Sequence, residues 1–135
     1  MLSGVHPLLT GELLLRLDQM GHSDAVVVSD AHFPARAAGQ HALVLPGVGA
    51  PELVAAIRSV LPLDSGIAVD LMRTPDGLTA LQHEMLIAAG VGPEGAAELE
   101  RAEFYARADA AFLAVRTGET RPFGNIILRK GLVTY

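Results

Sequence analysis

Cysteine is absent from the 135-residue chain, so disulfides, thiolate nucleophiles and sulfur-ligated metals are excluded. This absence fits a reducing compartment. No apolar run approaches the roughly 20 residues that cross a bilayer. The first residues, MLSGVHPLLTGELL, also lack the basic cluster and apolar run of a signal peptide. We therefore expect a cytoplasmic protein with no membrane partner.

Charged and aromatic side chains are both scarce. Charged residues make up 19% of the chain and aromatic residues 4%, whereas hydrophobic residues make up 50%. This composition excludes intrinsic disorder and requires an aliphatic core or subunit interface. The net charge of -5 has the wrong sign for holding a polyphosphate chain, so nucleic acid is not an expected partner. The length fits one domain over residues 1–135.

Hydrophobic periodicity predicts helices alternating with short strands. A helix capped by Thr10 carries apolar residues at helical spacing and stops at Gly21. Residues 25–28 read as a buried parallel strand. The other expected helices are 51–61, 78–89 and one within 98–110, and the other expected strands are 41–45, 66–72, 111–116 and 125–128. The alternation predicts the α/β class, a three-layer αβα sandwich around a central, largely parallel sheet.

The first buried strand has polar residues at both of its ends. Asp30 and His32 follow it, where α/β sheets place their working residues. His22 precedes it on a turn, where an imidazole is suited to acid/base chemistry, although an exposed or helix-capping histidine is equally consistent with this segment. A metal site built from these residues and Asp24 is a weaker alternative because their spacing matches no compact ligand motif. We therefore expect no metal.

Two further segments carry residue types that bind sugars. Phe123 and Asn125 flank Gly124 and would supply a ring to stack on a C–H face and an amide to bind hydroxyls. Ordinary turn chemistry is the competing interpretation of this segment. Arg101 offers a fork of hydrogen-bond donors, although a helix-surface charge is the simpler interpretation.

Several motifs in order resemble the RbsD/FucU family of sugar mutarotases, and within it the L-fucose mutarotase branch. They are MGHSD at 20–24, SDAHFPA at 29–35, EFY at 103–105 and TGETRPFGNIILRKG at 117–131. The resemblance covers essentially the whole chain. It implies an RbsD-like fold and an isomerase that interconverts the α and β anomers of L-fucose or a similar monosaccharide without a cofactor. It also implies ring-shaped homo-oligomers, such as decamers, with sites between subunits.

The resemblance also implies roles for individual residues. His22 is the implied catalytic proton donor, and Asp30 is implied to bind the sugar. We assign Asp30 to the catalytic site as the carboxylate that orients His22 or binds the sugar. Arg101 and the turn 123–125, which contains Phe123, Gly124 and Asn125, are implied to bind the sugar. The arginine at position 101 resembles the residue found in the fucose branch, because the ribose branch carries a histidine at this position.

The chain departs from the family pattern in two places. Phe123 replaces the usual tyrosine, which removes an expected hydroxyl, and Ala102 replaces a phenylalanine. Two alternative functions stay open at this point. One is a D-ribose pyranase-type activity, which passes through the same open-chain sugar, and the other is a non-catalytic monosaccharide-binding protein.

Overall fold

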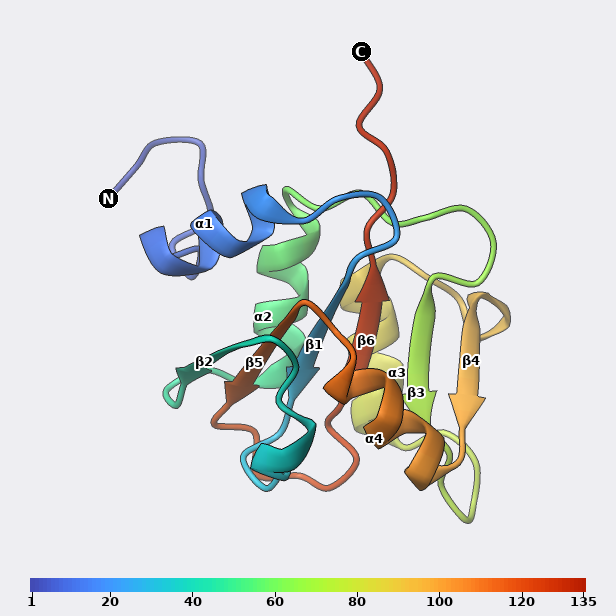
Figure 1. The fold of residues 1–135 in the computed structure, drawn as a ribbon. Helices are drawn as coiled ribbons and strands as arrows, with labels where there is room; N and C mark the ends of the chain where they lie inside the picture. Colours follow the sequence, from blue (N-terminus) through green and yellow to red (C-terminus); the bar gives the residue numbers. More distant parts are fainter.

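A six-stranded sheet forms the middle layer of the computed structural model, which describes residues 1–135 (Figure 1). The strands are β1 Ala25–Ser29, β2 His41–Leu45, β3 Val69–Met72, β4 Ala96–Leu99, β5 Leu113–Thr117 and β6 Ile126–Arg129. Their order is β2-β5-β1-β6-β3-β4. Only β6 runs against its neighbours, β1 and β3, and all other pairs are parallel. The α/β class and the largely parallel sheet are confirmed.

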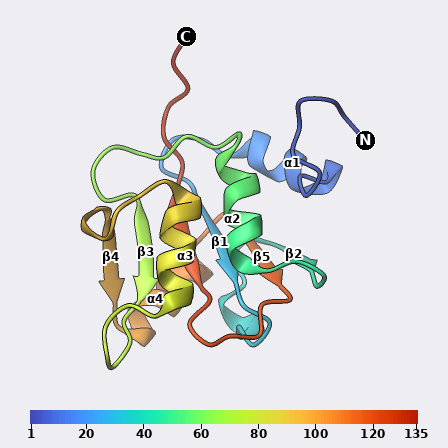
Figure 2. The same ribbon diagram turned by 180° about the vertical axis from the view of Figure 1, so that it is seen from behind.

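Helices cover both faces of the sheet. They are α1 Gly11–Gln19, α2 Ala50–Arg58, α3 Ala80–Ala89 and α4 Arg101–Asp109, with short 3-10 helices at Ala35–Ala37 and Pro93–Gly95. Helices α2 and α3 lie together on one face, and α4 and Ala35–Ala37 lie on the other (Figures 1 and 2). Helix α1 packs into the same core as α2 and α3. The expected three layers are therefore present.

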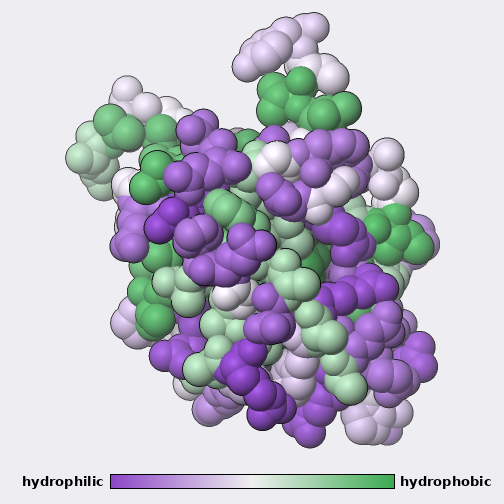
Figure 3. All heavy atoms as spheres, viewed as in Figure 1, coloured by the Kyte–Doolittle hydropathy of each residue, from purple (hydrophilic) through white to green (hydrophobic).

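The alternation of side chains along β1 separates two apolar cores. Val26 and Val28 point into the larger core under α2 and α3, whereas Val27 points into the smaller core under α4. The smaller core contains several alanines and the buried Phe104. Small side chains at this face let the short helix α4 lie close to the sheet. Figure 3 shows the mixed polar and apolar surface on this side, with exposed apolar residues at the chain ends.

Helix ends follow the local sequence signals. The Thr10 hydroxyl accepts a hydrogen bond from the Leu13 N–H, as expected of an N-cap. Helix α3 begins with a capping box between Thr79 and Gln82 and ends at Gly90, whose φ of 72° is left-handed. The buried Gln82 amide also donates to the Met72 carbonyl, which ties α3 to the end of β3.

Strand β4 was not predicted from the sequence. Its residues, AAEL, have weak strand propensity, and β4 is an edge strand that pairs only with β3. Tertiary pairing decides its conformation, so the helix expected within 98–110 begins only at Arg101. The expected strand at 66–72 is likewise shorter and starts at Val69.

The fold places two groups of loops at opposite ends of β1. The segments that follow β1 and β5, together with the start of α4, gather at its carboxyl end (Figure 1). The turn before β1, the segment after α2 and the end of β6 lie at its other end. No helix is long and apolar enough to span a membrane.

Candidate functional site

A small cavity of about 170 Å³ opens at the carboxyl end of β1. Nine residues line it: Asp30, His32, Phe33, Met72, Arg101, Tyr105, Pro122, Phe123 and Asn125. Five of them, Asp30, His32, Arg101, Phe123 and Asn125, are residues that the sequence singled out. The cavity is smaller than the roughly 300 Å³ at which ordinary drug-sized sites begin. Its size and mixed polar and apolar lining suit a small, hydroxyl-rich ligand.

Asp30 joins the two loops that form the cavity, the loop after β1 and the loop after β5. Its Oδ1 accepts from the His32 N–H at 3.0 Å, and its Oδ2 accepts from the Gly124 N–H at 3.2 Å. Its own N–H donates to Asn125 Oδ1 at 2.9 Å. Asp30 is only 4% exposed, so these contacts replace water. The carboxylate is therefore fixed in place, with lone pairs left to accept ligand hydroxyls.

The turn before β6 has a strained, tightly packed backbone. Phe123 has a φ of 60°, a left-handed conformation that costs a non-glycine residue about 1 to 3 kcal/mol. A Cβ on Gly124 would lie 3.0 to 3.2 Å from atoms of Leu81, Glu119 and Asp30. Asn125 Nδ2 makes no hydrogen bond within the chain. The turn thus presents an aromatic ring and a free amide donor to the cavity.

Helix α4 contributes Arg101 and Tyr105. Arg101 is exposed, forms no ion pair, and lies 6.0 Å from the Tyr105 ring centroid. A cation at the first residue of a helix opposes the helix dipole, so helix stability does not explain this arginine. Arg36 lies 5.4 Å from the same ring. Tyr105, which the sequence analysis did not assign to the site, places a phenol in the cavity.

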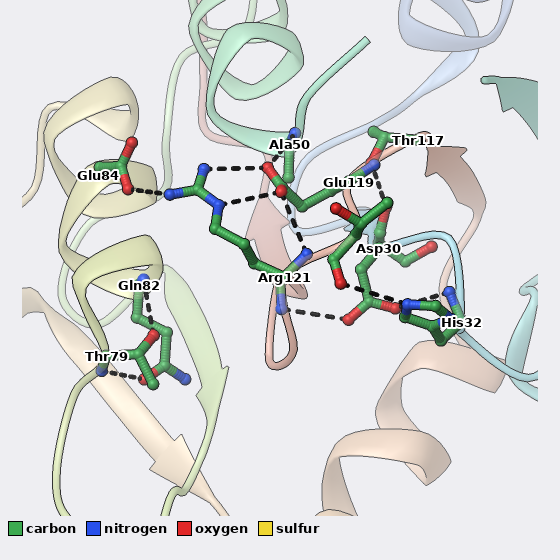
Figure 4. Close-up of polar contacts among 12 residues, drawn as sticks. Asp30, His32, Ala50, Thr79, Gln82, Glu84, Thr117, Glu119 and Arg121 are labelled. Carbon is green, nitrogen blue, oxygen red and sulfur yellow. Dashed lines mark hydrogen bonds and ion pairs between the residues drawn. The ribbon is translucent and has the colours of Figure 1, made fainter. Parts of the chain in front are cut away.

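An ion pair between the buried Glu119 and the half-exposed Arg121 supports the loop after β5 (Figure 4). Glu119 is 7% exposed and accepts from Arg121 Nε at 3.1 Å and from the Ala50 N–H, at the start of α2, at 3.3 Å. The hydrogen bonds from Arg121 hold the pKa of Glu119 below its usual value. Arg121 also pairs with Glu84 on α3, and the Glu119 carbonyl accepts from the Ala31 N–H at 2.9 Å. The loop that carries Phe123 is thereby anchored to two helices.

His22 lies at the opposite end of β1 and does not line the cavity. Its Nε2 is 2.9 Å from Asp64 Oδ1, and the neighbouring Ser23 hydroxyl donates to Asp64 Oδ2 at 2.9 Å. Both hydrogen bonds lower the pKa of Asp64. The His22 side chain is 51% exposed. Within one chain, therefore, the carboxylate that contacts His22 is that of Asp64 and not that of Asp30.

The alternative metal site does not form. His22 and Asp24 precede β1, whereas Asp30 and His32 follow it, so the four side chains cannot share an ion. No three His, Asp or Glu side chains anywhere in the chain form a group that could hold a metal.

Sequence reasoning missed Asp64 because it is 42 residues from His22, and no motif links them. Tyr105 could have been predicted from the sequence, since it belongs to the EFY motif one helical turn after Arg101.

Comparison with known proteins identifies similar chains. Residues 3–133 match the model of the RbsD / FucU transport protein family. The human fucose mutarotase is 39% identical over 98% of this chain and 94% of its own length. The fucose mutarotase of Streptococcus pneumoniae, solved with L-fucose, is 31% identical, with a TM-score of 0.87 over 98% of this chain and all of that one. Bacillus subtilis RbsD, solved with D-ribose, is 20% identical with a TM-score of 0.75 over 96% of this chain and 98% of that one, a likeness of fold.

Proposed function

The chain belongs to the RbsD/FucU family, and we propose that it is a cytoplasmic mutarotase that interconverts the α and β anomers of L-fucose. The observation that carries this proposal is the cavity in which Asp30, Arg101, Phe123 and Asn125 meet. The full-length similarity to fucose mutarotases supports the same substrate.

Mutarotation requires the sugar ring to open and close again. One group protonates the ring oxygen and another removes the anomeric hydroxyl proton, which gives the open-chain aldehyde. Arg101 and the Asn125 amide are the proposed donors to sugar hydroxyls, and Asp30 is the proposed acceptor. The Phe123 ring would stack on the C–H face of the sugar. These contacts would hold the sugar still while protons move.

We assign the acid to His22 of a neighbouring copy of the chain. His22 and Asp30 flank the five residues of β1, so about 15 Å or more separates them at 3.3 Å per residue. A single copy therefore cannot use both residues on one sugar. A ring-shaped homo-oligomer, in which the His22 end of one copy meets the cavity of the next, would complete the site.

Mixing two inactive variants tests this shared site. His22→Ala and Asp30→Asn should each be inactive alone, and each should have a mass by light scattering larger than that of a dimer. After unfolding and refolding together in equal amounts, about one site in four would take both intact residues from different copies. The mixture should then regain activity. A monomeric active wild type, or a mixture that stays inactive although the variants co-assemble, would contradict the shared site.

Saturation-difference proton NMR on the anomeric signals tests the activity. We expect the purified protein to accelerate anomer exchange of L-fucose more than ring interconversion of D-ribose, with or without a chelator. Faster turnover of D-ribose would favour a pyranase. Binding of L-fucose without faster anomer exchange would indicate a non-catalytic sugar-binding protein.

Phe123→Tyr should raise kcat/KM for L-fucose severalfold. The substitution restores a hydroxyl at the cavity, worth about 0.5 to 1.5 kcal/mol if it bonds a sugar oxygen. The ring and its left-handed backbone conformation are retained, so folding should not change. Exchange rates at several sugar concentrations measure the effect. An unchanged or lower value for every sugar tested would mean that the Tyr105 phenol, or another group, already fills that place.

A further inference from the structure

His32 lines the cavity beside Asp30, and neither the proposed sugar contacts nor the proposed acid involves it. Its backbone N–H donates a hydrogen bond to Asp30 Oδ1 at 3.0 Å, which fixes the backbone at this residue. Its ring Nε2 lies 3.3 Å from the Thr120 carbonyl oxygen (Figure 4). These contacts hold the side chain between the loop after β1 and the loop after β5, and it lines the cavity with Arg101 and Phe123.

The contact with Thr120 sets the tautomer of His32. A carbonyl oxygen only accepts hydrogen bonds, so Nε2 must carry the proton. In the neutral ring, Nδ1 then carries a lone pair and has no partner within the chain. A histidine held in this way is a proton acceptor.

The other polar groups of the cavity are less suited to take a proton. Both oxygens of Asp30 accept from backbone N–H groups. Arg101 has no lone pair to offer, and the Asn125 amide presents its nitrogen. Tyr105 is a phenol, whose O–H is a hydrogen-bond donor. His32 is the one imidazole that the chain places in its own cavity.

We propose that His32 is the base of the mutarotase, an inference that rests on the proposed function. Its Nδ1 removes the proton from the anomeric hydroxyl while His22 of the neighbouring copy protonates the ring oxygen. The bond between the anomeric carbon and the ring oxygen breaks, and an aldehyde and a hydroxyl form. After rotation about the bond to the aldehyde carbon, ring closure returns each proton to the group that gave it. No net proton, electron or cofactor is consumed.

The charged and titratable groups around His32 come from four segments. Asp30 precedes it on its own loop, Arg101 and Tyr105 face the cavity from α4, and Arg36 lies against the Tyr105 ring. In the loop that carries Thr120, Glu119 pairs with Arg121, which also pairs with Glu84 on α3. In this mechanism His32 must be unprotonated at Nδ1 and His22 must be protonated. The rate should therefore fall at low pH as His32 gains a proton and at high pH as His22 loses one.

The test is the pH profile of the exchange rate for wild type, His32→Asn and His83→Asn. His83 is an exposed histidine on α3, distant from the cavity lining, and serves as the matched control. We expect His32→Asn to lower the rate at neutral pH by about 10²-fold or more, the usual scale of a lost base, and to remove the fall at low pH. Sugar affinity should change less than the rate. His83→Asn should behave as wild type.

The outcomes separate this inference from the proposed function. An active wild type together with a His32→Asn variant that keeps its rate and its low-pH fall would overturn the role of His32 alone. A wild type without exchange would overturn the function itself. If His32→Asn does not fold by circular dichroism, His32→Gln takes its place, with the same expected loss of the low-pH fall.

Discussion

His22→Ala should lower the rate of L-fucose anomer exchange by about 10²- to 10⁴-fold, the usual scale of one acid/base group. The loss should fall on kcat, because the cavity keeps Asp30, Arg101 and Asn125 for binding. Stability should hardly change, since the His22 side chain is half exposed and its hydrogen bond is to Asp64 at the surface. Anomeric exchange by NMR and sugar binding by calorimetry measure the two effects separately.

Asp64→Asn is the matched control for His22→Ala. It keeps the imidazole but weakens the contact that orients it, so we expect a smaller loss of rate than in His22→Ala. Added imidazole should restore part of the rate to His22→Ala, because the missing function is proton transfer. A wild-type rate in His22→Ala, or a loss of sugar binding equal to the loss of rate, would remove the acid role from His22.

The parts of the site that depend on local pattern were predictable from the sequence. A run of valines ending at Asp30 indicates a buried strand whose carboxyl end leads into loops, and the structure places the cavity there. The 123–125 turn was recognisable from its Gly and Asn and from the family resemblance. These features are encoded within a few residues, so no long-range contact is needed to predict them.

The parts that depend on contacts between distant segments were not predictable. Asp64 meets His22 across 42 residues, and Glu119 meets the start of α2 at Ala50 across 69. Periodicity gave no reason to pair them. Strand β4 is a similar case, because its conformation is decided by pairing with β3 rather than by its own residues. That His22 and Asp30 lie at opposite ends of β1 was implicit in the predicted strand.

The strongest effect on stability is expected at Asp70, in the strand next to the edge strand β4. Asp70 is fully buried on β3, and its carboxylate accepts from Arg129 on β6 and, at 3.3 Å, from Arg107 on α4. Arg107 also pairs with Glu103. The cluster thus contains two carboxylates and two guanidinium groups, so its charges sum to zero. Asp70 is the only one of the four whose side chain has no contact with water.

Asp70→Ala should lower the free energy of unfolding by about 3 kcal/mol, the low end for a broken buried ion pair. The low end applies because Arg129, which loses its partner, keeps a 23% exposed side chain and can be partly rehydrated. Urea denaturation measures the change, with all variants at one protein concentration because assembly would add to the apparent stability.

Glu103→Gln is the control for Asp70→Ala because it removes a partner of the same arginine, Arg107, at the surface. Its side chain is 52% exposed, so the loss should stay within about 0.5 kcal/mol. The double variant Asp70→Leu/Arg129→Met removes both charges and should recover most of the stability lost in Asp70→Ala, because no unpaired charge remains. If Asp70→Ala costs no more than Glu103→Gln, the buried cluster is not a determinant of stability. If the double variant is less stable than Asp70→Ala, the ion pair itself, rather than the charge left unpaired, stabilises the sheet.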